Sequence, residues 1–165
     1  MEMREMPLAE KYDKLLDDYL LANAVGYTLH KELKVVDQSN DLWVQVQKKL
    51  FPSVLGVAFK VLKTISPGKA FKQVTNQYVY SLQRFIPVSN IEVTMTSDRE
   101  ATVRITNCPV LKRQRTLLKK AGLDIGPRYL CEIDATINPE VANAFGVDLN
   151  IELEENGCTT TAKLK

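Results

Sequence analysis

"IEVTMTSDREATVRIT" (residues 91–106) is where the periodicity of the chain changes from helical to extended. Apolar and polar residues alternate over 91–96 and again over 101–106, as on two strands that each bury one face. The "SDRE" between them has the length and composition of a hairpin turn. These residues therefore predict an antiparallel pair of strands.

Helical periodicity precedes this hairpin. Apolar residues recur mostly at three- and four-residue steps over 8–33, and they continue with near-helical spacing over 42–62 after the cap-type residues "SND". Pro52 should kink or break that second segment. A third helix is expected to start at Ser66-Pro67 and to run through Phe85.

Two more strands are expected near the C-terminus. Residues 147–153 and 158–164 alternate around an "EENG" turn. Between the two hairpins, 109–121 fits a basic helix that closes at Gly122, whereas 127–138 fits either a strand or a helix. The pattern predicts an α+β fold, with N-terminal helices packed on an antiparallel sheet of about four strands and one or two inserted helices.

Size and composition predict one domain, 1–165, with a helical half (1–87) and a sheet-containing half (88–165) that holds the cysteines. A net charge of +2 is too small to indicate nucleic-acid binding. No apolar run approaches the ~18–20 residues that cross a membrane, and the charged N-terminus does not resemble a signal peptide. Three cysteines do not suggest a disulfide framework. We expect a cytoplasmic protein with reduced thiols.

Cys108 lies at the corner between the second strand and the basic helix, directly before Pro109. A cysteine at a helix N-terminus faces unpaired backbone N–H groups and the positive end of the helix dipole, and both stabilise a thiolate. Lys112 adds positive charge one turn later. Cys108 is therefore a candidate nucleophile or metal ligand, and the alternative is a small buried side chain at a corner.

A second motif, "CEID", places Cys131 and Asp134 three residues apart. The two side chains share a face on a helix and point to opposite faces on a strand. The alternative is a buried thiol beside a solvated acid, and Glu132 is a less well placed carboxylate. Cys158 follows the last turn, where a lone cysteine is more often a core residue.

The spacing of the three cysteines matches no zinc finger or ribbon, because those pair cysteines two to four residues apart. Three thiols and one carboxylate could still complete a tetrahedral zinc site if the fold brings Cys108, Cys131, Asp134 and Cys158 together. A site closed in this way would brace the structure rather than catalyse. His30 is the only histidine, which disfavours a Ser-His-Asp triad.

Three short motifs, "NCP", "LCEID" and "NGCTTTAKL", occur in this order within residues 88–165. They resemble the 2-amino-thiazoline-4-carboxylate hydrolase family and the related 4-vinyl reductase-like domains. The resemblance implies an α+β domain around a small-molecule pocket. In the sensor relatives, cysteines and one acidic residue bind zinc near that pocket, which implies Cys108, Cys131, Asp134 and Cys158 as ligands.

The Cys-then-Asp order of "CEID" looks more like the hydrolase branch of the resemblance. A shared site also requires Cys131 and Asp134 to lie on one face, so we predict a helix over 127–138.

Two functions follow as hypotheses. The first is a small-molecule-binding domain in which a thiol-rich, zinc-binding site braces a ligand pocket. The second is a hydrolase that opens a thiazoline-type or amidine-like ring at a C–N bond, with Cys108 as nucleophile or metal ligand and Asp134 as general base. The scarcity of histidines favours binding. A homodimer that forms through the helical half is a further expectation.

Overall fold

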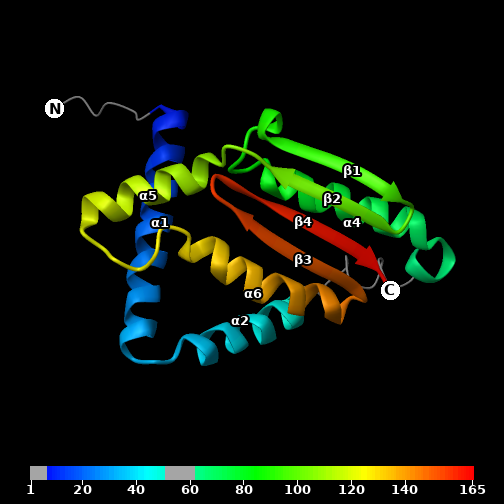
Figure 1. The fold of residues 1–165 in the computed structure, drawn as a ribbon, viewed down its shortest axis with the longest axis horizontal. Coiled ribbons are helices and arrows are strands. Elements are labelled where there is room, and N and C mark those ends of the chain that lie inside the picture. Colours follow the sequence, from blue (N-terminus) through cyan, green and yellow to red (C-terminus); the bar gives the residue numbers. More distant parts are fainter. Residues whose placement is uncertain (1–6, 51–61) are drawn as a thin grey trace.

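The computed structural model describes residues 7–50 and 62–165 (Figure 1). Helices come first along the chain, then two β-hairpins separated by two helices, so the predicted α+β class is confirmed. The elements are α1 (Leu8–Glu32), α2 (Val36–Leu50), α4 (Pro67–Leu82), a 3₁₀ turn η1 (Val88–Asn90), β1 (Ile91–Ser97), β2 (Glu100–Ile105), α5 (Pro109–Ala121), α6 (Tyr129–Ala144), β3 (Val147–Glu154) and β4 (Gly157–Leu164).

Two boundaries bear on the sequence predictions. α2 begins at Val36, before the "SND" residues that were expected to cap it, and the chain turns instead at Lys34, which has a positive φ of 56°. The ambiguous segment 127–138 is helical from Tyr129 onward, within α6, so the helix predicted there is confirmed. The break expected at Pro52 lies outside the described residues.

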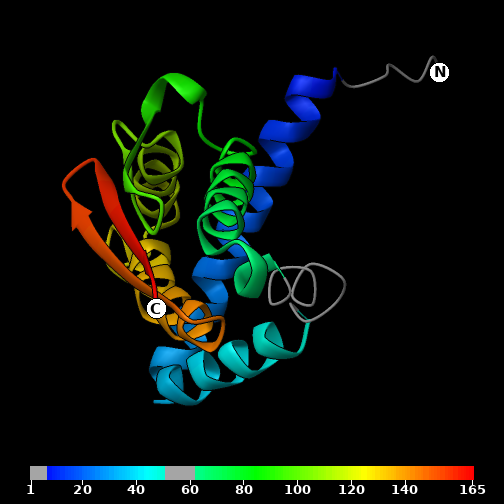
Figure 2. The same cartoon turned by 90° about the vertical axis from the view of Figure 1, so that its right-hand side faces the viewer.

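The strands form one antiparallel sheet in the order β1-β2-β4-β3. β4 is therefore central and pairs with both β2 and β3, so that Cys158 lies opposite Ile105 on one side and Leu153 on the other. Figure 2 shows the helices gathered on one face of this sheet. The opposite face carries polar residues, among them Arg104 and Lys163, which are exposed.

Two groups of buried residues hold the layers together. Ala70 and Phe71 of α4 pack on strand residues, among them Ala101 and Leu164. A second group joins α1 to the N-terminal end of α6 and to α5: Ala24, Leu118, Ile125 and Tyr129. The Tyr129 hydroxyl donates a hydrogen bond to the Leu20 carbonyl (2.7 Å), and burial raises the pKa of Tyr129 to about 12.

One predicted face is not buried. Ile91, Val93 and Met95 alternate as expected for a strand, but β1 is an edge strand, and Val93 and Met95 are exposed. Among the described helices, none has both the length and the apolar character needed to cross a membrane.

Candidate functional site

Cys108 occupies the N-cap position of α5, as the Cys-Pro pair predicted. Its backbone N–H donates to the Asn156 carbonyl in the β3–β4 turn (2.8 Å). The Asn90 side chain donates to the Asn107 carbonyl (3.3 Å), and Asn107 has a positive φ of 48°, which asparagine tolerates. The corner is thus tied to η1 and to the β3–β4 turn.

Gly157 lets these segments meet. A Cβ atom at this position would lie 1.8 Å from the Ile105 carbonyl oxygen, so no side chain fits there. The close approach sets Cys158 opposite Ile105, three residues before Cys108. The end of β2 and the start of β4 therefore bring Cys108 and Cys158 into the same region of the molecule.

Cys131 comes to this region from α6. Burial raises the pKa of the Cys131 thiol to about 11, and negative charge on Cys108 and Asp134 raises it further. Burial likewise raises the pKa of Cys158 to about 12, with additional contributions from Cys131, Cys108 and Asp134. These mutual effects place the predicted site residues in one neighbourhood. They also keep the Cys131 and Cys158 thiols protonated at neutral pH.

The described residues do not form a metal centre. Within 7–50 and 62–165, no three His, Cys, Asp or Glu side chains are placed to hold one ion. Cysteine sulfurs bind zinc at about 2.3 Å, so the three thiols and Asp134 would have to move closer together. Zinc binding by these residues stays a prediction.

Asp134 is the ionisable group on which this neighbourhood centres. Its side chain is exposed, yet the surrounding protein raises its pKa to about 6 through desolvation. Solvent therefore touches the carboxylate, while the protein around it weakens its hydration. None of the hydrogen bonds or ion pairs among the described residues involves Asp134, so its charge has no partner there.

Two tyrosines lie near Asp134. The pKa of Tyr19 on α1 is raised by burial and then by the charge of Asp134. Burial also raises the pKa of Tyr78 on α4, and the charges of Cys158 and Asp134 add to the effect. The Tyr78 hydroxyl lies 3.4 Å from the Thr160 hydroxyl on β4, two residues beyond Cys158. We call Tyr19, Tyr78, Cys131, Asp134 and Cys158 the Asp134 site.

The ring of Tyr19 stacks on Phe85, with centroids 6.5 Å apart and planes inclined by 13°. Both side chains stay partly exposed, Tyr19 by 54%. Tyr19 recurs at helical spacing with the apolar residues of 8–33, and no sequence pattern connected it with the cysteines. The one available signal was a phenolic hydroxyl on an otherwise apolar helix face.

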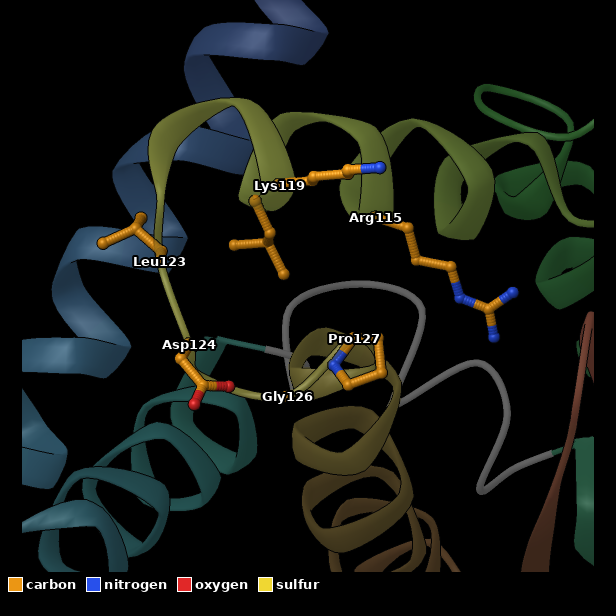
Figure 3. Close-up of a pocket in the computed structure, with 7 residues that line it drawn as sticks. Arg115, Lys119, Leu123, Asp124, Gly126 and Pro127 are labelled. Atoms are coloured by element: carbon orange, nitrogen blue, oxygen red, sulfur yellow. The ribbon is translucent and has the colours of Figure 1, made fainter.

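Two shallow surface pockets lie elsewhere. The first, of about 190 Å³, is bounded by the end of α5 and the segment that leads to α6, with Arg115, Lys119 and Asp124 at its rim (Figure 3). The second lies where β2 ends and contains the ion pair of Arg104 and Glu154 (3.1 Å). Neither is lined by a cysteine or by Asp134, and both are smaller than the ~300 Å³ or more of a typical ligand site. The Asp134 site is therefore the stronger candidate on chemical grounds.

Comparison with known proteins gives little to set beside this geometry. No protein-family model matches the chain, and no curated protein matches it. A crystal structure of a trafficking protein particle complex subunit 3 from Naegleria fowleri, covalently bound to palmitic acid, is similar at 14% identity and a TM-score of 0.40. The alignment covers 92% of this chain and 96% of that chain. At this TM-score the likeness carries no argument, and the family resemblance of the cysteine motifs stays a prediction.

Proposed function

We propose that this protein binds a small organic molecule at the Asp134 site. The observation that carries the proposal is the unpaired carboxylate of Asp134, which is partly desolvated and which lacks a cation or hydrogen-bond donor among the described residues. A partly desolvated charge without a partner is costly to keep. A ligand that supplies the partner would offset that cost.

The side chains around the carboxylate define the chemistry of the ligand. Asp134 accepts hydrogen bonds and attracts positive charge, while Tyr19 and Phe85 offer stacked aromatic surface. The hydroxyl groups of Tyr78 and Thr160 can donate or accept. A compact molecule that joins an ammonium or amidinium group to an aromatic or aliphatic body fits this set.

The binding test uses defined probes. Isothermal titration calorimetry with benzylamine and tryptamine, compared with the neutral benzyl alcohol and indole-3-ethanol, should show tighter binding of the two cations. Asp134→Asn should abolish that preference. Glu132→Gln is the matched control, because it removes a charge from the same helix at an exposed position where no described residue pairs with it. Equal binding of cations and alcohols, or equal effects of the two substitutions, would reject the proposal.

The zinc brace predicted from the sequence has its own test. Elemental analysis of the purified protein should find about one zinc per chain if the brace exists, and Cys108→Ser should lower that content together with thermal stability. A metal-free protein that still discriminates cations from alcohols would reject the zinc and leave the ligand site standing.

A hydrolase that opens a C–N bond in a thiazoline-type or amidine-like ring is the second candidate. One observation favours it: a carboxyl with a pKa of about 6 is suited to act as general base near neutral pH. In this reading Cys108 is the nucleophile and Asp134 the base. Hydrolysis of the ring C–N bond of 2-amino-thiazoline-4-carboxylate adds one water, frees the ring nitrogen as an amine and leaves the sulfur as an S-carbamoyl group. Formation of this amine should occur with the natural protein and fail with Cys108→Ser. No turnover by the natural protein would exclude this reaction.

A further inference from the structure

Helix α1 carries two apolar faces. Leu16, Leu20 and Ala24 form the first and are buried against the rest of the molecule. The second is exposed: Leu15 keeps 68% and Leu33 keeps 69% of its surface. A surface helix of a globular protein needs one apolar face, towards the core. A second one, left open, is typical of a surface that another protein covers.

The exposed face has a regular spacing. Leucines at 8, 15, 29 and 33 are joined by Tyr12, Tyr19, Ala22 and Gly26, so that steps of four and three residues alternate along the whole helix. This is the heptad spacing of a helix that packs lengthwise on another helix. We call these eight positions the α1 seam.

Most of the molecule lies on the other side of α1. Two seam residues also have a contact within the chain, because the Tyr12 hydroxyl donates to the Arg84 carbonyl and the Tyr19 ring stacks on Phe85 at one edge of the seam. Arg113 of α5 pairs with Asp13 and Asp17, and Tyr129 of α6 bonds to the Leu20 carbonyl. Figure 2 shows the first turns of α1 extending beyond the other described elements, with the sheet and α5 towards the opposite side. A Cβ atom added at Gly26 would meet no atom within 4 Å, so the middle of the seam is open.

We propose that the α1 seam is the interface of a homodimer, in which α1 packs antiparallel on α1 of a second copy. Antiparallel pairing centred between Leu20 and Leu21 matches every seam position with another. The layers are Leu8 with Leu33, Tyr12 with Leu29, Leu15 with Gly26, and Tyr19 with Ala22. Large side chains then face the two smallest ones, as close packing requires. Parallel pairing would set Gly26 against Gly26 and leave a void.

The charges beside the seam agree with this orientation. Antiparallel pairing brings Lys11 of one copy within about two residues, or about 3 Å along the axis, of the level of Glu32 of the other. Lys11 already has an interaction within its own chain, and an ammonium group has three N–H donors, so it can take a further acceptor. The two-fold symmetry gives this pair twice. The inference rests on α1 and shares only Tyr19 with the Asp134 site.

The first test is the mass of the protein in solution. Light scattering after gel filtration should give twice the 18.6 kDa chain mass at about 100 µM. Replacing both Leu15 and Leu29 by Glu should weaken the dimer at least 100-fold, with an unchanged circular dichroism spectrum because both side chains are exposed. The control is Lys14→Glu together with Lys31→Glu, which puts the same residues on exposed positions outside the seam.

The second test is the register. Protein with Leu15→Cys, mixed with protein with Gly26→Cys, should form a covalent dimer on mild oxidation, while Leu15→Cys alone should not, because the two copies of residue 15 lie about 16 Å apart along the axis. A mixture of Glu10→Cys and Lys31→Cys is the control, since these positions lie at matching levels on the opposite side of α1.

A monomer at 100 µM would overturn the proposal. So would a dimer that survives the two Glu substitutions, or one in which Leu15→Cys cross-links to itself, since the first indicates another surface and the second a parallel pair.

Discussion

Replacing Gly157 by Ala should unfold a substantial part of the molecules under mild denaturing conditions. The new Cβ would lie 1.8 Å from the Ile105 carbonyl oxygen and 2.9 Å from its carbon, whereas ordinary contact begins near 3.4 Å. Relief requires β2 and β4 to part by about 1.6 Å, the difference between the first and last of those distances. The neighbour is backbone in a sheet, so it cannot rotate away.

The expected cost follows from what the separation breaks. The ladder pair of Ile105 with Cys158 and the bond from the Cys108 N–H to the Asn156 carbonyl are next to the clash. Each net hydrogen bond is worth about 1 kcal/mol, and a buried group left unpaired costs more. The total is about 3 kcal/mol, a large fraction of the stability of a small domain.

Urea unfolding followed by circular dichroism measures this cost. With a slope of about 2 kcal/mol per molar urea, the midpoint should fall by about 1.5 M. Gly122→Ala is the control: Gly122 has a left-handed backbone, with φ of 66°, but a Cβ there meets nothing within 4 Å. That control should cost only about 1–2 kcal/mol for the left-handed conformation. If the Gly157→Ala protein is no less stable than the control, β2 and β4 do not approach each other as closely as described.

Three further changes have defined outcomes. Tyr129→Phe removes the donor to the Leu20 carbonyl and should lower the free energy of unfolding by about 1–2 kcal/mol in urea titrations, so an unchanged midpoint would contradict the contact. Asp134→Asn should raise the melting temperature at pH 7.5 but not at pH 4. The pKa of Asp134 is higher in the folded than in the unfolded protein, so the natural protein loses stability as the pH rises from about 4 to 6. A higher melting temperature at both pH values would contradict this. The hydrogen bond from Arg113 lowers the pKa of Asp17, so this pair stabilises the folded protein above about pH 4 and stops doing so as the pH falls below it. Arg113→Met should therefore destabilise the protein above about pH 4 and have little effect at lower pH. A loss of stability that does not depend on pH would show that Arg113 acts through packing.

Local patterns predicted much of the architecture. Alternation over 91–106 and 147–164 depends on neighbours along one strand, and both hairpins are confirmed. The Cys-Pro pair predicted the start of α5, because a proline, which lacks an N–H, fits the first turn of a helix and the preceding strand ends just before it. The helical reading of "CEID" is also confirmed, although it was reached through the need for Cys131 and Asp134 to share a face.

The assembly of the candidate site depended on the tertiary structure. β4 lies between β2 and β3, and that order brings Cys158 to the end of β2 and so to Cys108. Tyr19 and Tyr78 reach Asp134 from helices far away in the sequence. No short-range pattern encodes such neighbours, because they depend on which apolar faces pack together.

The same distinction applies to α1 and to the corner at Cys108. Sequence patterns were enough to predict that α1 is a helix with many apolar residues and that a cysteine begins α5. Which of these apolar residues are buried, and which thiols lie near the Asp134 carboxylate, became visible in the folded structure. Periodicity depends on the local conformation of a segment. Burial and proximity depend on contacts between segments, and the distance between two segments along the chain does not indicate whether they touch.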